Sequence, residues 1–250
     1  DESWKDRLNE KQQGQPSDSV RTAGGYPAPV DEYVNDYAGV IRPEDAKAIR
    51  DQLGRVEYQT GIEITVVTIG SIRDYGTADS SIESFATHLF NDWGIGQMPR
   101  NDGVLILAAI QDRKCRIELG AGYGFAYNSV MKDVIDGTMI PHFKIDNYSQ
   151  GLKAGAFDVV GRVTKPISWY EFHKWHIVVG VLIVICIIAG ISCMISGKTG
   201  WGWIFFMYAA ALLMLLIKML QAGQSSRGWG GGGSSFGGGF SAGGGASGSW

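Results

Sequence analysis

The carboxylates of this chain are confined to its first part. All 25 aspartates and glutamates of the 250-residue chain lie at or before Glu171. Only four formal charges follow, on Lys174, Lys198, Lys218 and Arg227. An ordinary soluble surface carries many charged side chains of both signs, so the composition of the last part is not that of a soluble domain.

The first 171 residues have the opposite character. They carry 18 basic and 25 acidic side chains, a net charge of −7, and no basic cluster. Phosphate binding requires a local excess of basic side chains, so no nucleic-acid partner is expected.

Two long apolar stretches follow. Residues 177–196 carry no charge and residues 201–220 carry only Lys218. At 1.5 Å per residue, a helix of about 20 residues crosses roughly 30 Å of hydrocarbon. The sequence therefore predicts transmembrane helices at 177–196 and 201–220, with the lipid bilayer as a partner. The short connection between them requires an antiparallel hairpin, and residues 166–176 are predicted to form a juxtamembrane linker.

The two ends of the chain lack the pattern of a packed domain. Residues 1–29 are polar and broken by proline and glycine, which predicts a disordered or partner-bound arm. Residues 221–250 form a Gly/Ser-rich tail that is too poor in apolar area to fold alone and is predicted to order only against a partner. Its predicted partner-binding anchors are the spaced aromatics Trp229, Phe236, Phe240 and Trp250.

Residues 30–165 have the periodicities of a globular α/β domain. Pro43 suits the first turn of a helix that Gly61 ends, and the β-branched alternation of residues 62–69 predicts a strand. The apolar run 103–110 predicts a central strand covered on both faces, joined by the polar turn 111–114 to a second strand. The full predicted order is helix from 43, strand 62–69, helix 81–93, strands 103–110 and 115–119, and helices 130–141 and 151–163. This order predicts a small sheet between helices.

Several separated motifs resemble those of one family. They are NDYAGV at 35–40, TGIEITVVT at 60–68, DWGIG at 92–96, NDGVLIL at 101–107, DR at 112–113 and RIELG at 116–120. Their order and spacing resemble the TPM domain over residues 30–165. That family includes plant thylakoid-lumen proteins linked to photosystem repair and phosphatase activity, an animal receptor accessory protein and bacterial YgcG-like membrane proteins. The tail ending GASGSW at 245–250 resembles that of the YgcG-like group.

The resemblance suggests metal-assisted phosphate hydrolysis, which needs oxygen ligands converging on a hard cation. Asp36, Asp102 and Asp112 adjoin predicted strand ends or turns and are the candidate ligands for calcium or another divalent cation. Each also fits a simple turn role. The family's Gly-Leu-Glu-Gly stretch is replaced here by residues 122–128, with Asn128 nearest to its aspartate, which predicts a weakened metal site.

Two other groups in this region have a functional and a structural interpretation. Arg113 and Arg116 could hold a phosphate, but a solvated position or a pair with Glu118 is more typical of a strand and its turn. Cys115 is expected to be a small core residue rather than a reactive thiol.

The sequence leaves two functions open. The favoured one is a membrane-anchored accessory, assembly or structural subunit that docks its TPM-like domain on a larger integral membrane protein complex, photosynthetic if the resemblance extends that far. The alternative is a metal-dependent phosphatase at the membrane surface. The flanking lysines and arginines favour a cytoplasmic domain, whereas the family resemblance and the absence of an initial methionine favour the periplasmic or lumenal side, which is the expectation adopted.

Overall fold

The computed structural model describes residues 25–165, 169–197, 199–221 and 236–250. These residues fall into two compact units: one contains the chain up to Lys165 together with its C-terminal segment, and the other contains residues 166–227. Most of the predicted arm, residues 1–24, lies outside the described residues, as does Trp229.

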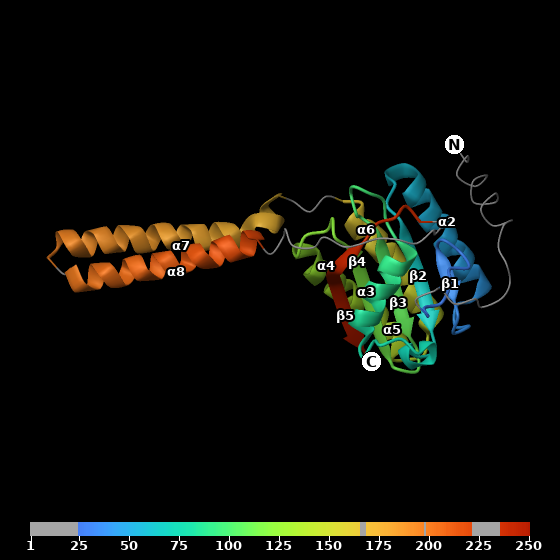
Figure 1. Ribbon diagram of the computed structural model, residues 1–250. Coiled ribbons are helices and arrows are strands. Elements are labelled where there is room, and N and C mark those ends of the chain that lie inside the picture. The colour runs from blue at the N-terminus through green and yellow to red at the C-terminus, as the bar shows by residue number, and fades with distance from the viewer. Residues whose placement is uncertain (1–24, 166–168, 198, 222–235) are drawn as a thin grey trace. The chain divides into compact units, whose positions relative to one another are not determined.

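The first unit is built on a mixed sheet with strand order β1-β2-β3-β4-β5 (Figure 1). The strands β1, β2 and β3 are parallel, whereas β4 is antiparallel to both β3 and β5. Their bounds are β1 Val34–Asp36, β2 Ile64–Ile69, β3 Val104–Ala109, β4 Lys114–Gly120 and β5 Ser241–Ser249. The expected α/β fold is confirmed, with β3 at the centre of the sheet and a hairpin turn after it.

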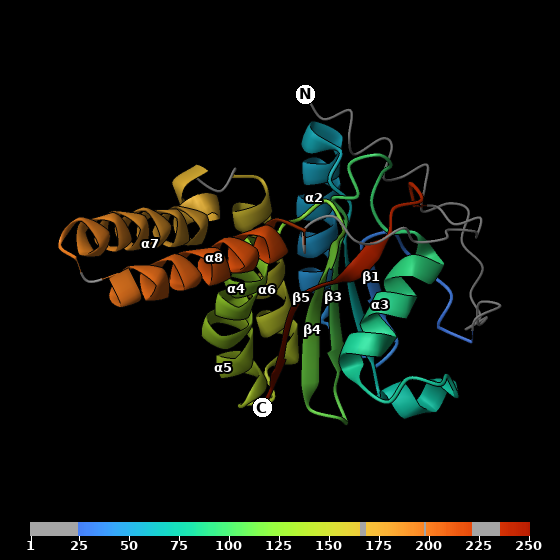
Figure 2. The ribbon, with the colours of Figure 1, turned by 60° about the vertical axis from the view of Figure 1, so that its left-hand side comes forward.

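Helices cover both faces of this sheet (Figure 2). Helix α3 lies on one face, and α2, α4, α5 and α6 lie on the other. The bounds are α2 Pro43–Thr60, the 3₁₀-helix η1 Ile72–Tyr75, α3 Ile82–Trp93, α4 Ala126–Val134, the π-helix η2 Ile135–Met139, α5 Ile140–Phe143 and α6 Tyr148–Val163. Helix α2 has Pro43 in its first turn and ends at Gly61, whose φ of 72° is strained for other residues.

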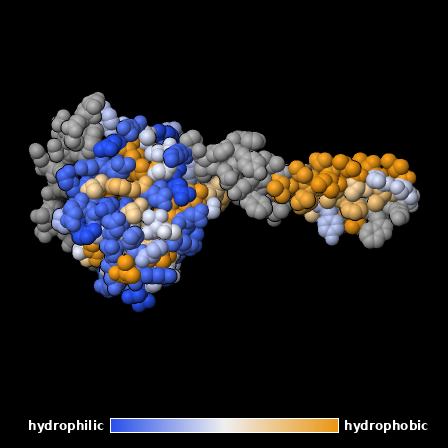
Figure 3. Space-filling model, turned by 180° about the vertical axis from the view of Figure 1, so that it is seen from behind, coloured by the Kyte–Doolittle hydropathy of each residue, from blue (hydrophilic) through white to orange (hydrophobic). Residues whose placement is uncertain are grey.

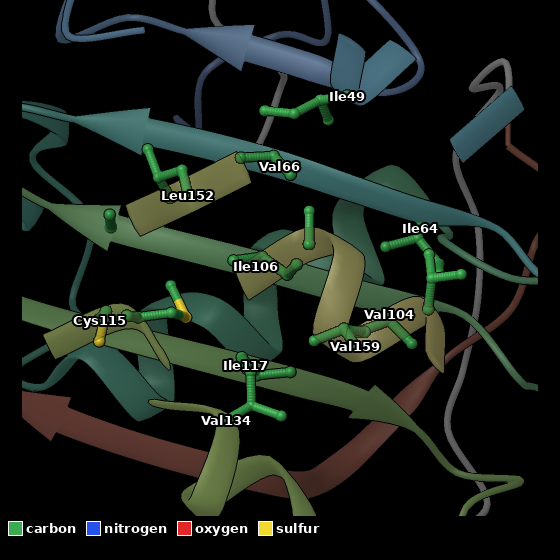
Figure 4. Close-up of a cluster of buried hydrophobic side chains, with 14 of the residues drawn as sticks. Ile49, Ile64, Val66, Val104, Ile106, Cys115, Ile117, Val134, Leu152 and Val159 are labelled. Atoms are coloured by element: carbon green, nitrogen blue, oxygen red, sulfur yellow. The ribbon is translucent and has the colours of Figure 1, made fainter. Parts of the chain in front are cut away.

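Strand alternation sends apolar side chains to two separate cores. On β2, Ile64 and Val66 join the larger core, while Val67 and Ile69 join the core under α3. In Figure 4, alternate residues of β2, β3 and β4 meet side chains from the helices of the larger core. Because every residue of β2 and β3 is buried, these strands have the nearly unbroken apolar sequence of central strands.

The second unit consists of two helices, α7 (Trp169–Ile195) and α8 (Thr199–Gln221), which pack side by side as a hairpin. Helix α7 begins at Trp169, inside the segment predicted as a juxtamembrane linker; no proline or glycine lies between Trp169 and Val179 to delay the helix. Among the residues that the structure describes, no helix meets both the length and the apolarity that a membrane span requires.

The C-terminal segment corrects a second prediction. Instead of ordering only against a partner, residues 241–249 form strand β5 along β4 of the same unit. The prediction considered only the small apolar area within the tail. The strand is also stabilised by main-chain pairing with β4 and by contact of Ala246 and Trp250 with the larger core.

Candidate functional site

Asp36 and Asp112 lie at or just beyond the carboxyl ends of parallel strands, where α/β domains commonly place sites. Both carboxylates serve local structure. Asp36 accepts the backbone N–H groups of Val40 and Ile41 at 3.1 and 2.8 Å and the hydroxyl of Thr68. Asp36 therefore builds the Asx-type turn that leads into α2.

The carboxylate of Asp112 performs a similar task for the 3₁₀-helix η1. It accepts the Ser71 hydroxyl at 2.8 Å and the Ile72 backbone N–H at 3.0 Å. Those contacts tie the β3–β4 turn to the start of η1. Like Asp36, Asp112 therefore has a structural role in the described fold.

Asp102 lies at the other end of β3. The six residues of β3 span about 20 Å at roughly 3.3 Å per residue, so Asp102 cannot share an ion with Asp112. Its Oδ2 pairs with Arg100 Nε at 3.1 Å, while its buried Oδ1 has no hydrogen-bond partner within the described part of the chain. Burial raises the pKa of Asp102, and Arg100 opposes that shift.

The three predicted ligands therefore do not converge. Within the described residues, no group of three or more His, Cys, Asp or Glu side chains is arranged to hold a metal ion. The prediction of a shared divalent-cation site involving Asp102 is wrong. Asp102 lies at the amino end of β3, whereas Asp36 and Asp112 lie near the carboxyl ends of β1 and β3.

A buried polar network lies instead on the α3 side of β4, where β5 joins the sheet. The Arg116 guanidinium pairs with Glu118 at 2.7 Å, and Glu118 also accepts the hydroxyls of Thr87 and Ser241. Burial raises the pKa of Glu118, although Arg116 and the hydroxyl donors oppose the shift. The phosphate-binding role considered for Arg116 is not available, because its guanidinium pairs with Glu118 and binds the tail.

Arg116 carries this network to the C-terminal segment. Its guanidinium donates to the carbonyl oxygens of Gly243 and Gly244 at 3.1 and 3.2 Å and contacts the Ser247 hydroxyl at 3.3 Å. From the other side, Asn128 Oδ1 accepts the N–H of Gly245 at 2.8 Å. Asn128, the stand-in for the family's aspartate, therefore holds the tail strand.

A second carboxylate, Glu63, holds the beginning of the segment. It accepts the N–H of Gly96 at 2.7 Å and that of Gly237 at 3.2 Å. Burial raises the pKa of Glu63, and the two N–H donors oppose the shift. Nearby, Phe240 donates its N–H to Asn101 Oδ1 at 3.2 Å.

The tail aromatics that the structure describes contact their own unit. Phe236 stacks on Trp93 with ring centroids 5.8 Å apart. The ring of Trp250 lies 4.6 Å from that of Phe143 and 5.9 Å from that of Tyr148, and the Trp250 backbone N–H donates to the Arg113 carbonyl at 3.3 Å. These residues are intramolecular anchors in the structure, contrary to the expectation of a separate partner.

Sequence reasoning missed Glu63, and it named Glu118 only as a partner of Arg116, a pair that the structure shows. Both glutamates lie at positions where the strand pattern demands a buried side chain, and a carboxylate there must be paired or hydrogen-bonded. A carboxylate at a strand position that the pattern predicts to be buried therefore indicates a paired or hydrogen-bonded side chain. Cys115, by contrast, is the expected core residue: burial raises the pKa of its thiol to about 12.

The fold and this site define an α/β domain with a mixed sheet completed by the end of the chain. The family model described as the TPM domain matches residues 34–162, and the chain belongs to that family. A search of curated proteins found no match.

Solved structures of bacterial proteins are similar to the chain. The N-terminal domain of a protein from P. gingivalis is 27% identical with a TM-score of 0.45, covering 61% of this chain and 90% of that one. The N-terminal domain of the cg2496 protein of Corynebacterium glutamicum is 16% identical with a TM-score of 0.42, covering 60% and 94%. The BA42 protein of Bizionia argentinensis is 23% identical with a TM-score of 0.41, covering 50% and 81%.

Proposed function

We propose that the chain is a YgcG-like, membrane-anchored accessory or assembly subunit, with the α7–α8 hairpin as its anchor and the TPM domain as its docking module. One observation carries the proposal: large apolar side chains of the hairpin are exposed. The described surface of the hairpin is largely hydrophobic in the view of Figure 3. Ile195 is 82% exposed, Met207 72% and Met214 70%. Soluble proteins rarely leave so much contiguous apolar surface uncovered.

The distribution of these side chains favours lipid over a single protein partner. At about 100° per residue, the exposed apolar positions of α7 extend over more than half of its circumference. These positions are Val178, Val181, Leu182, Val184, Ile185, Ile187, Ile188, Ile191, Met194 and Ile195. A helix that docks in a protein groove needs only a stripe, whereas a helix that is apolar on nearly all sides suits a bilayer.

The test is vesicle flotation of the full chain reconstituted with phosphatidylcholine and phosphatidylglycerol. We expect it to float with the vesicles at high salt and after alkaline carbonate treatment, because the attachment is apolar. A chain in which a glycine-serine linker replaces residues 166–227 should remain in the aqueous fraction. Release of the wild-type chain by carbonate, with its TPM domain still folded, would disprove the anchor.

Docking and sidedness belong to the same proposal. The acidic domain suits a membrane complex that presents a basic surface, and cross-linking in native membranes followed by mass spectrometry would identify such a complex.

Ile145 is 71% exposed, so a cysteine placed there reports on which side of the membrane the domain lies. Labelling of Ile145→Cys in intact cells by an impermeant maleimide is expected if the domain is extracytoplasmic.

The phosphatase alternative gains no support from the site. Two of its proposed ligands, Asp36 and Asp112, stabilise a turn and a 3₁₀-helix. The third, Asp102, lies at the opposite end of the strands, before β3. No observation of the described residues favours this reaction.

A further inference from the structure

The loops before β3 and after β4 meet at one edge of the first unit. Gly122, which follows β4, donates its N–H to the carbonyl oxygen of Asn101, which precedes β3, at 2.9 Å. Arg100 donates to the carbonyl oxygen of Thr60 at 3.0 Å, which adds the end of α2 to this edge. We call this region the loop edge, and its described segments are 58–63, 97–103, 120–126, 161–165 and 236–240.

Both connections to the α7–α8 hairpin leave the first unit at the loop edge. Helices α2 and α6 begin side by side, where the Ser149 hydroxyl donates to Asp45 at 2.6 Å, and both end at this edge in Figures 1 and 2. Lys165 follows α6 and is four residues before the start of α7 at Trp169, so this connection spans at most about 14 Å. Where the chain returns, residues 236–240 bond to the loop before β3. The loop edge is therefore the part of the domain from which an anchor would extend.

Large apolar side chains are exposed on this edge. Met98, in the loop before β3, is 58% exposed, and Phe125, at the start of α4, is 63% exposed. Neither side chain belongs to the two cores of the sheet. Tyr58, near the end of α2, is also exposed. Apolar side chains exposed at an edge from which an apolar segment extends suit insertion into the interfacial region of a bilayer.

The charges of the loop edge differ from those of the domain as a whole. The first 171 residues carry a net charge of −7, yet the carboxylates in the segments of the loop edge are Glu63 and Asp102, and neither is exposed. The exposed cations of these segments are Arg100, Arg162 and Lys165. The two arginines pair with neighbouring carboxylates, but their side chains remain 49% and 44% exposed.

The opposite edge, at the carboxyl ends of the parallel strands, has exposed carboxylates, among them Glu44, Asp74 and Asp146. An anionic membrane surface attracts lysine and arginine and repels carboxylates. The loop edge is therefore the edge that such a surface accepts more readily.

We propose that the loop edge is a lipid-contact site, at which Met98 and Phe125 enter the interfacial region of an anionic bilayer and Arg100, Arg162 and Lys165 lie among its headgroups. The inference rests on the proposed membrane anchor and adds which edge of the TPM domain meets the lipid. Contact at this edge leaves the acidic opposite edge accessible to a protein partner.

Lipid quenching of a single fluorophore tests the contact in the full chain. Cysteine is introduced by Phe125→Cys or, as the control, by Ile145→Cys on the opposite edge, with Cys186 and Cys193 replaced by alanine; Cys115 is buried and stays unlabelled. Each nitrobenzoxadiazole-labelled chain is reconstituted with phosphatidylcholine and phosphatidylglycerol, with and without a lipid that carries a nitroxide near its headgroup. We expect the nitroxide to quench the label at 125 and to leave the label at 145 bright. Equal quenching at the two positions would overturn the proposal.

A third label separates this result from the anchor itself. Met207→Cys places the fluorophore on an exposed position of α8, where lipids with a nitroxide deeper in the acyl chain report insertion of the hairpin. Quenching at 207 without quenching at 125 would overturn the loop-edge contact and leave the anchor in place. Absence of quenching at both positions would overturn both proposals.

A reporter beside the two apolar side chains shows whether they make the contact. Gln59 is exposed on the loop edge, so labelled Gln59→Cys should be quenched by the headgroup nitroxide. Adding Met98→Asp and Phe125→Asp should reduce that quenching, because two carboxylates replace the inserted side chains at an anionic surface. Adding Ile145→Asp, an equally exposed change on the opposite edge, should not. Unchanged quenching in the Met98→Asp/Phe125→Asp chain would overturn the role given to these side chains.

Discussion

At the scale of single residues, the most consequential pair is Arg116 with Glu118. Both side chains are buried, 8% and 0% exposed; Thr87 and Ser241 donate to Glu118, and Glu83 lies near Arg116. Removing one partner of a buried pair leaves the other charge without compensation, which commonly costs about 3–5 kcal/mol. The loss would also release the carbonyl contacts that Arg116 makes to the tail.

We therefore expect Glu118→Ala to lower the unfolding free energy of the full chain by about 3 kcal/mol or more, measured by urea denaturation. The control is Asp136→Ala, which removes the exposed Lys132–Asp136 pair and should cost less than about 1 kcal/mol. Similar losses from the two substitutions would show that the buried pair contributes no more than a surface one.

Asp45 makes stability sensitive to acid. Burial raises its pKa, but hydrogen bonds from Lys153, Ser149 and Arg42 outweigh burial and hold the pKa below its ordinary value of 3.8. A carboxyl whose folded pKa is lowered contributes stability above the unfolded pKa and loses it as the pH falls.

Unfolding of the wild-type chain should therefore become easier below about pH 4, and Asp45→Asn should flatten this dependence. Glu63 and Glu118, whose pKa values are raised, act in the opposite direction and are present in both proteins, so the difference between the two curves isolates Asp45. Parallel curves for the two proteins would contradict the assignment.

Site residues differ in how readily the sequence reveals them. The strand pattern correctly locates Asp36 and Asp112 next to strand ends. Asp36 has the turn role expected for it, whereas the Asp112 carboxylate bonds to the start of η1 rather than within its own turn. Asp102 and Asp112 flank the predicted strand 103–110, so their separation of more than about 20 Å follows from the sequence at roughly 3.3 Å per residue. The place of Asp36 relative to them does not, because the sequence does not show which strand β1 pairs with. Asn128 is identified only by resemblance, and its contact with Gly245 depends on a strand 117 residues away.

At the scale of elements, periodicity locates the structure wherever a side-chain pattern exists. Helices α2 and α3 and strands β2, β3 and β4 lie close to their predicted places. Strand β1 has three residues, two of them polar, and is too short to show alternation. Strand β5 consists of Ser, Ala and Gly, which have little strand preference, so tertiary contact decides its conformation.

Strand β5 should consequently be protected in the isolated, partner-free chain. Hydrogen exchange of residues 244–249 is expected to be slow, because β4 pairs with β5 without interruption from Gly244 to Ser249, before the register shift that precedes Ser241. Trp250→Ala should speed that exchange by removing contact with Phe143 and Tyr148, while exposed Ser249→Ala should not. Rapid exchange of the wild-type strand would show that β5 is not part of the folded unit in solution.

At the scale of the whole molecule, the TPM domain is discontinuous in sequence. Its first part ends at Lys165, and its last strand follows residues 166–227, which form the second unit. The periodicities of residues 30–165 predict a domain that folds alone. Without β5, however, the seven-residue strand β4 would become an exposed edge, and Trp93 and Phe143 would lose ring contacts. Uncovered edges of this kind promote association between molecules.

Two fragments can measure what the last strand contributes. One contains residues 25–165, and the other joins residues 25–165 to 222–250, which keeps the natural connection to β5 and deletes the second unit. We expect the second fragment to be monomeric at low concentration and to unfold cooperatively at a urea midpoint clearly above that of the first, because it restores strand pairing and both aromatic contacts. A third fragment, the joined form with Gly245→Val, contains the same number of residues but cannot place β5 against Ile117. Its midpoint should match that of residues 25–165, and a midpoint equal to the intact joined form would mean that β5 does not stabilise the domain.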